Sequence, residues 1–125
     1  MLLDTSAWIE FFNGSNKGKR VKTILNAEKC YTSMVSIAEI VNWSRKEDRN
    51  EELLVGKVEE LSLIVGIDKS IAMLAGKLNF ERKKMNKKWG MADSFILATG
   101  SIYGINILST DRDFEDISSA EILKY

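Results

Sequence analysis

An α/β fold with three layers around a mainly parallel central sheet is the class that the sequence predicts. Short apolar segments alternate with longer segments whose apolar residues recur every three or four positions, as expected for strands that alternate with helices. A chain of 125 residues with 45% hydrophobic content is long enough for one well-packed core and too short for two. We therefore expect a single domain over residues 1–125.

Strand and helix signals follow one another closely in the first half of the chain. The elements predicted there, in order, are a strand over 1–4, helices over 6–12 and 17–27, a strand over 29–32, and a helix over 35–46. Gly14 is typical of a helix end, because glycine tolerates the left-handed backbone that stops a helix. The apolar residues from Trp8 to Phe12 cover more than one face of the first helix, so we expect part of it to contact a partner chain.

The second half continues the alternation and ends in a strand. Its predicted elements, in order, are a helix over 50–61, a strand over 63–65, helices over 68–85 and 90–103, a strand over 106–109, a turn or short helix over 111–116, and a closing edge strand over 121–123. The helix over 90–103 is apolar almost all round until Gly104 ends it. We therefore expect this helix to be buried against the sheet.

The composition excludes several classes of function. Lysine plus arginine and aspartate plus glutamate both number 18, so the overall charge gives no reason to expect strong attraction to nucleic acid or to membranes. The chain has one cysteine, no membrane-length apolar run and no secretory leader pattern, so we expect a cytoplasmic protein without membrane contact. The absence of histidine excludes a Ser-His-Asp triad, an imidazole acid-base pair and a histidine-zinc site.

Four acidic residues stand beside apolar segments and form a candidate metal site. Asp4 and Asp111 each follow a predicted strand, while Glu39 and Asp93 lie in the early turns of predicted helices. In parallel sheets, sites form outside the carboxyl ends of the strands, so these side chains could meet at one edge. A buried carboxylate needs a hydrogen bond, an opposite charge or a cation, and hard divalent ions prefer oxygen ligands. We therefore expect a Mg²⁺ or Mn²⁺ site at this edge of the sheet.

Each of these acids also has a simpler structural interpretation. Asp4 and Asp93 could cap the helices that follow them, and Asp111 could start a turn. Glu39 stands three residues after Ser36, which is the spacing of a capping box. Taken singly, these interpretations compete well with a metal site. Four such acids in one small domain favour the metal site.

Basic residues gather between the last two predicted helices. They are Arg82, Lys83, Lys84, Lys87 and Lys88. These residues could contact phosphate groups, or they could form a soluble helix end whose positive charge suits the helix dipole. Their closeness in sequence to Asp93 favours phosphate contacts. Trp89 could stack a nucleobase or lie in the core, Trp8 is similarly open, and Trp43 is expected in the core.

Four short motifs occur along the whole chain in a specific order. They are Leu-Leu-Asp-Thr-Ser-Ala-Trp, Val-Ser-Ile-Ala-Glu-Ile, Met-Ala-Asp-Ser-Phe-Ile-Leu-Ala-Thr and Ser-Thr-Asp-Arg-Asp-Phe. Together they resemble the motifs of PIN-domain ribonucleases, and in particular those of the small VapC-type toxins of prokaryotic toxin-antitoxin pairs. The resemblance implies a PIN-like fold and a Mg²⁺- or Mn²⁺-dependent endoribonuclease that cleaves RNA, binds a cognate antitoxin protein and forms a homodimer.

The resemblance also implies roles for individual residues. The family's four acidic positions, which would be the metal ligands and catalytic residues, fall on Asp4, Glu39, Asp93 and Asp111. Its hydroxyl positions, which would orient the ligands through hydrogen bonds, fall on Thr5 or Ser6 and on Thr110. Asp113 matches an acidic position in some members, so the fourth ligand is either Asp111 or Asp113. The phosphate contacts would come from Lys83, Lys84, Lys87 and Lys88.

Two other functions compete with a nuclease. Asp111 and Asp113 have the Asp-x-Asp spacing of aspartyl phosphatases, but twelve residues after Asp113 are too few to complete that catalytic domain. A non-enzymatic, Mg²⁺-binding domain of the phospho-receiver kind would place a lysine at the end of a late strand, where this chain has Ser109, Thr110 and Asp111. The sequence therefore favours the nuclease over both.

Overall fold

The computed structural model describes residues 1–124 and contains one sheet of five parallel strands. The elements in chain order are β1 (Leu2–Leu3), α1 (Thr5–Asn13), α2 (Asn16–Ala27), β2 (Tyr31–Ser33), α3 (Met34–Lys46), α4 (Glu51–Leu61), β3 (Leu63–Val65), α5 (Lys69–Lys83), α6 (Met91–Tyr103), β4 (Ile107–Ser109), the 3₁₀ helix η1 (Arg112–Phe114) and β5 (Ala120–Ile122). Each element that the sequence predicts is present, with boundaries that differ by at most two residues. Among these residues, no helix is both long and apolar enough to cross a lipid bilayer.

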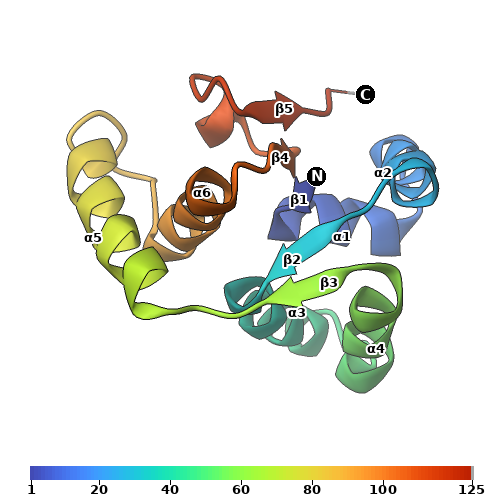
Figure 1. Cartoon of the computed structure of the whole chain (residues 1–125). Helices are drawn as coiled ribbons and strands as arrows, with labels where there is room; N and C mark the ends of the chain where they lie inside the picture. Colours follow the sequence, from blue (N-terminus) through green and yellow to red (C-terminus); the bar gives the residue numbers. More distant parts are fainter. Residues whose placement is uncertain (125) are drawn as a thin grey trace.

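The strand order in the sheet is β3-β2-β1-β4-β5 (Figure 1). The central strand β1 pairs on both sides, with Leu2 beside Tyr31 in β2 and beside Ile107 in β4. All neighbouring strands run in the same direction, so their carboxyl ends lie at one edge of the sheet. The residues that follow β1, β2 and β4 therefore meet at the edge where the sequence predicts a site.

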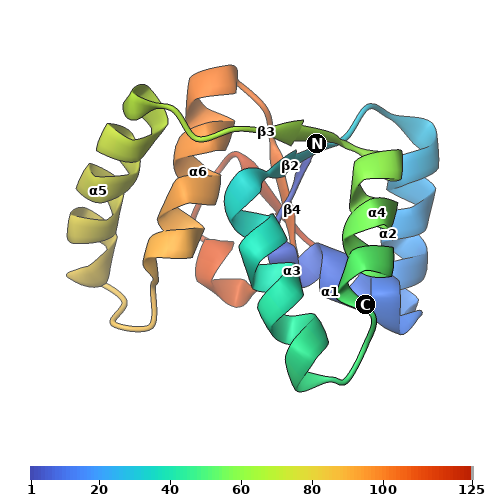
Figure 2. The same cartoon turned by 90° about the horizontal axis from the view of Figure 1, so that it is seen from below.

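Helices cover both faces of the sheet, which confirms the predicted three-layer α/β class. Leu3 and Leu108 point to the face covered by α1 to α4, where they pack with Trp8 and Ile40. Their neighbours in the strands point to the opposite face, which α5 and α6 cover. Figure 2 shows α5 and α6 on one side of the strands and α2 and α4 on the other. Two apolar clusters, one on each face, thus hold the short strands in place.

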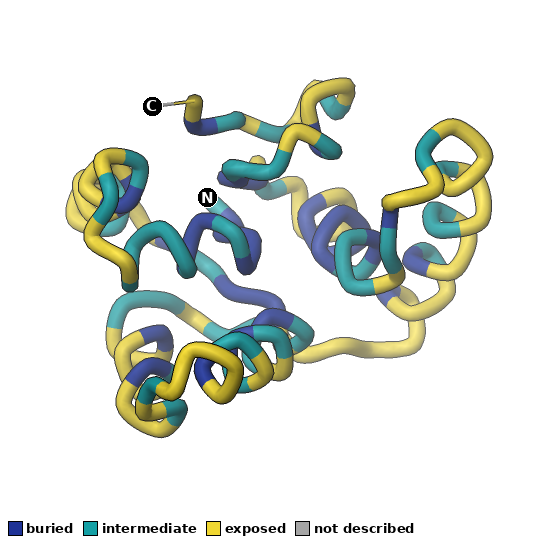
Figure 3. Tube along the Cα trace, turned by 180° about the vertical axis from the view of Figure 1, so that it is seen from behind, coloured by how far each residue is buried: buried dark blue, intermediate teal, exposed yellow. Residues whose placement is uncertain are grey.

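Burial resolves the expectations about the three tryptophans. Trp8 and Trp89 are fully buried, and their indole nitrogens donate to Thr32 Oγ1 at 3.1 Å and to Ser94 Oγ at 2.7 Å. Trp43, which is expected in the core, is only half-buried and packs against the margin of one apolar cluster. Figure 3 shows the buried residues gathered along the strands and the adjoining sides of α1 and α6.

The chain itself covers most of the first helix. Trp8 is buried, and Phe11 and Phe12 are half-buried. The ring of Phe12 stacks against Trp43 of α3 with 6.3 Å between the ring centroids. The surface that α1 leaves for a partner chain is therefore smaller than its sequence indicates.

Helices α1 and α2 approach each other closely at Gly18. Gly14 ends α1 with a φ of 65°, and this left-handed residue turns the chain so that α2 packs back on α1. A Cβ atom on Gly18 would overlap the backbone carbonyl of Glu10 in α1. The contact therefore requires glycine at this position.

We expect Gly18→Ala to lower the free energy of unfolding by about 3 kcal/mol, because the methyl group would force α1 and α2 apart. The matched control is Gly56→Ala in α4, where nothing lies within 4 Å of an added Cβ. The control should gain about 0.5–1 kcal/mol from the better helix propensity of alanine. Urea unfolding of the three proteins checks this, and two variants of equal stability would contradict the close packing.

Candidate active site

Asp4 lies at the carboxyl end of β1 and caps α1. Its carboxylate accepts hydrogen bonds from the backbone N–H of Ser6 and from Ser109 Oγ, the latter at 2.5 Å. The residue is 4% exposed. Burial raises the pKa of Asp4 from its ordinary 3.8 to about 6, hydrogen bonds from Ser109 and Ser6 oppose this rise, and the charge of Asp111 adds to it. Asp4 is therefore the N-cap of α1, and it is also buried at the edge of the sheet where the site is predicted.

Ser109 connects Asp4 to Asp111 across the sheet. Its hydroxyl donates to Asp4 and accepts the backbone N–H of Asp111 at 2.9 Å. The Ser6 hydroxyl lies 3.2 Å from it and accepts the backbone N–H of Thr110 at 3.0 Å. The sequence pointed to Thr110 as a supporting hydroxyl, but Thr110 contributes its backbone N–H and Ser109 contributes the hydroxyl.

Glu39 reaches from α3 to α1. One of its carboxylate oxygens lies 2.6 Å from Thr5 Oγ1, which also lies 2.9 Å from Ser36 Oγ. A carboxylate can only accept, so Thr5 donates to Glu39. The capping-box interpretation of Glu39 is wrong, because the N-cap of α3 is Ser33. The predicted role of Thr5 in orienting an acidic side chain agrees with this geometry.

Asp93 lies in the first turn of α6. Its Oδ2 accepts the backbone N–H of Gly90 at 3.2 Å. Gly90 is the N-cap, so the interpretation of Asp93 as the N-cap residue is wrong. Burial raises the pKa of Asp93 to about 6, with the charges of Asp4, Asp111 and Glu39 adding to the rise.

The four carboxylates thus share one edge of the sheet and repel one another. Asp93 experiences the charges of Asp4, Asp111 and Glu39 at once. Within residues 1–124, however, no three acidic or cysteine side chains are close enough to form a ready-made metal cage. Each of the four carboxylates has at least one oxygen in a hydrogen bond. A set of oxygen donors with mutual repulsion suits a hard divalent cation.

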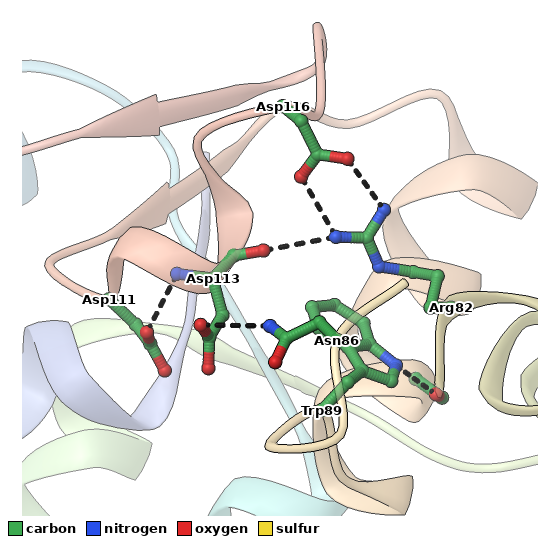
Figure 4. A network of polar contacts seen from close by, with 7 residues as sticks. Arg82, Asn86, Trp89, Asp111, Asp113 and Asp116 are labelled. Atoms are coloured by element: carbon green, nitrogen blue, oxygen red, sulfur yellow. Dashed lines mark hydrogen bonds and ion pairs between the residues drawn. The ribbon is translucent and has the colours of Figure 1, made fainter. Parts of the chain in front are cut away.

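Asp113 points toward a different neighbour. Its Oδ1 accepts a hydrogen bond from Asn86 Nδ2 at 3.0 Å, and its backbone oxygen accepts one from Arg82 at 3.0 Å (Figure 4). Asp111 has its own contact, because its Oδ1 accepts the backbone N–H of Asp113 at 2.9 Å. Of these two acids, only Asp111 contributes to the raised pKa values of Asp4 and Asp93.

The basic residues lie at the end of α5 and in the loop that leads to α6. Lys83, Lys84, Lys87 and Lys88 are all exposed. Lys84 forms an ion pair with Glu81 at 3.5 Å, and Lys83 donates to the backbone oxygen of Lys87 at 3.4 Å. Trp89 is fully buried in this arrangement, so it cannot stack a nucleobase. Phosphate contact through the lysines and a soluble helix end both agree with these positions.

Several polar side chains make contacts at the site that the sequence does not predict. They are Ser36, Ser109, Asn86 and Arg82. Ser109 directly follows the apolar residues of β4, so a polar residue at a buried strand end was the available signal. The spacing of Ser36 predicts a capping residue, whereas its hydroxyl contacts Thr5 of α1.

A parallel sheet with acidic side chains gathered outside its carboxyl edge is typical of α/β ligand-binding domains and enzymes. The sequence matches the PIN domain over residues 1–120, and the chain therefore belongs to the PIN-domain family, whose members are nucleases. None of the curated proteins compared with this sequence matches it.

The fold is similar to those of solved toxin-antitoxin proteins. A toxin-antitoxin complex from Klebsiella pneumoniae has a TM-score of 0.75 at 23% identity, over 96% of this chain and 94% of that chain. DNA-bound VapBC from Salmonella typhimurium has a TM-score of 0.72 at 21% identity, over 98% and 95%. VapC20 of Mycobacterium tuberculosis, a toxin that cleaves the sarcin-ricin loop, has a TM-score of 0.76 at 14% identity, over 94% of both chains. At these identities the likeness establishes the fold.

The raised pKa of Asp93 predicts a pH-dependent effect of Asp93→Asn in metal-free protein. The folded state holds a proton on Asp93 up to about pH 6, whereas the unfolded chain releases it near pH 3.8, so ionisation of Asp93 costs stability increasingly between these values and fully above them. Because Asp93 is partly exposed, we expect the variant to be more stable than wild type by about 1–2 kcal/mol near pH 7.5. Near pH 4 the two proteins should be equally stable. Urea unfolding in the presence of a chelator measures the stability difference between the two proteins at each pH. A difference that does not change with pH would contradict a raised pKa of Asp93.

Proposed function

We propose that this chain is a metal-dependent endoribonuclease that hydrolyses RNA phosphodiester bonds and acts as the toxin of a toxin-antitoxin pair. The observation that carries the proposal is that four carboxylates converge at one edge of the sheet. Asp4 and Asp111 follow the paired strands β1 and β4 and are joined through Ser109. Glu39 reaches Thr5, the residue next to Asp4, and the charges of these three acids all act on Asp93. Membership of a nuclease family supports the same chemistry. Membership of this family leaves the aspartyl-phosphatase and phospho-receiver alternatives without support.

The metal ligands in this proposal are Asp4, Glu39, Asp93 and Asp111, which would hold one or two Mg²⁺ or Mn²⁺ ions. When bound, such an ion supplies a water of lowered pKa and neutralises charge on the phosphate. No histidine exists to act as a base, so the carboxylates and the ion they hold are the groups left for this chemistry. The contribution of the protein is to keep its acidic oxygens in position before the RNA arrives.

Hydroxyl groups hold the proposed ligands in their orientations. Thr5 donates to Glu39, and Ser109 donates to Asp4. Ser6 supports the turn after β4 by accepting the N–H of Thr110. The bond from Thr5 fixes one oxygen of Glu39 and leaves its other oxygen available for a ligand. Both oxygens of Asp4 accept hydrogen bonds, one from the Ser6 N–H and one from Ser109, so Asp4 would contact an ion through the remaining lone pairs of these oxygens.

The partners proposed for this chain are RNA, a cognate antitoxin and a second copy of itself. The structures similar to this fold include toxin-antitoxin complexes, which supports a protein partner. A groove of about 450 Å³ between α1, α2 and α4 supports this as well, because Phe11 and Leu61 line it beside Lys22 and Lys57. Apolar lining with a basic margin suits an amphipathic, acidic segment of an antitoxin.

A cleavage assay with purified protein and structured RNAs tests the proposed activity. We expect cutting in Mn²⁺, none in chelator, and losses of roughly 100-fold or more in Asp4→Asn and Asp93→Asn, because each removes a charged ligand. Asp68→Asn is the matched control, since it makes the same change at the exposed N-cap of α5. Cutting that persists in both site variants would mean that the activity comes from another site or from a contaminant.

Removal of two lysines tests the predicted RNA contacts. We expect Lys87→Gln with Lys88→Gln to weaken binding of single-stranded RNA and to reduce the slope of log affinity against log salt by about 1 to 2, because two phosphate contacts are lost. The control pair is Lys69→Gln with Lys77→Gln, which removes the same charge from exposed positions elsewhere on α5. A salt slope that falls equally in both pairs would show that only net charge matters.

A further inference from the structure

The loop between α5 and α6 holds the turn that carries Asp111 (Figure 4). Arg82 at the end of α5 contacts both carboxylate oxygens of Asp116, at 2.9 and 3.2 Å, and the backbone oxygen of Asp113 at 3.0 Å. Asn86 contacts the side chain of Asp113 at 3.0 Å. Arg82 and Asn86 therefore connect the end of α5 and the loop after it to the turn after β4. Asp113, which both of them contact, lies two positions from Asp111.

Arg82 is itself held by aromatic packing. Its guanidinium lies 4.1 Å from the ring centroid of Trp89, and the Trp89 ring lies 5.0 Å from that of Phe114. The indole nitrogen of Trp89 donates to Ser94, the residue next to Asp93. The same packed unit thus supports the start of α6, with Asp93, and the turn after β4, with Asp111.

The orientation of the Asn86 amide is determined by its two contacts. Its Oδ1 accepts the backbone N–H of Lys88 at 3.0 Å. Its NH₂ group must therefore face Asp113, which acts as the acceptor. The backbone N–H of Asp113 in turn donates to Asp111 Oδ1, so a continuous series of contacts runs from Asn86 through Asp113 to Asp111.

We propose that Asn86 and Asp113 form a tether that positions Asp111 at the acidic edge, and that Asp113 is a positioning residue and not the fourth metal ligand. The inference rests on the proposed function, because the role of Asp111 as a ligand comes from it. Asp113 already uses one carboxylate oxygen for Asn86 and its backbone for Arg82 and Asp111. Asp111 also uses one carboxylate oxygen, for the backbone N–H of Asp113, but of these two acids only Asp111 lies near enough for its charge to act on Asp4 and Asp93.

Three variants separate a tether from a ligand. Asp113→Asn keeps an oxygen that can accept from Asn86, so the tether survives without the charge. Asn86→Asp places two carboxylates across a 3.0 Å contact and breaks the tether. The double variant Asn86→Asp with Asp113→Asn restores a donor and an acceptor in the reversed order, while the carboxylate introduced at position 86 can still accept from the backbone N–H of Lys88. Met85→Asp, the control, adds the same charge as Asn86→Asp at an adjacent, exposed position.

The measurements are Mn²⁺ affinity by calorimetry and amide hydrogen exchange of residues 111–117 in chelator. For Asn86→Asp we expect about tenfold weaker Mn²⁺ binding and about tenfold faster exchange at Asp113. Asp113→Asn and the double variant should both lie within about threefold of wild type, and Met85→Asp should show neither loss. The proposal is overturned if Asp113→Asn abolishes Mn²⁺ binding, or if the double variant fails to recover what Asn86→Asp loses.

The exchange measurement separates this inference from the proposed function. Exchange in chelator reports on the tether without any metal, whereas Asp93→Asn reports on the metal site without touching the tether. Suppose that wild type binds Mn²⁺, that Asp93→Asn does not, and that exchange is unchanged in Asn86→Asp. This result would support the metal site and contradict the tether. Wild type that binds no Mn²⁺ would remove the site, and the positioning role with it.

Discussion

The burial of one carboxylate, that of Asp4, is the constraint on which the rest of the site depends. Asp4 stands where the central strand ends, and β4 pairs beside it, so the sheet itself removes this carboxylate from water. Two hydrogen bonds, from Ser6 and Ser109, offset part of the cost, and a pKa of about 6 records the part that is not offset. For stability alone, a neutral N-cap such as serine or asparagine would cap α1 without the cost of a buried charge. The retained acid is therefore best explained by its chemistry.

The surrounding acids show how a protein can gather like charges and still fold. Each carboxylate has its own partner close by in the structure, such as Thr5 for Glu39 and the backbone of Gly90 for Asp93. These partners fix the carboxylates near one another without bringing them, among the described residues, into chelating contact. The remaining repulsion is a free-energy cost that a bound cation would relieve, so binding and folding are coupled at this edge.

Local pattern was enough to predict the elements, the layers and the edge at which the acids meet. Apolar periodicity and glycine at helix ends are short-range signals, and they placed every boundary within two residues. The roles of Ser109 and Ser36 could not be found in this way, because Ser109 bonds to a residue 105 positions away and Ser36 to one 31 positions away. The spacing of Ser36 and Glu39 was misleading, since the N-cap of α3 is Ser33, which leaves Glu39 free to reach α1. The burial of the tryptophans depends on tertiary packing, on the helix face in the case of Trp8 and Trp43 and on the path of the α5–α6 loop in the case of Trp89.

The order of the strands has a consequence for the synthesis of this protein. β1 is the first strand made, but its neighbour β4 and the donor Ser109 belong to the last part of the chain. A nascent chain carries Asp4, Glu39 and Asp93 before it carries Asp111, and the sheet cannot place them together until β4 has left the ribosome. A nuclease of the proposed kind would thus lack its complete acidic edge through most of its own synthesis.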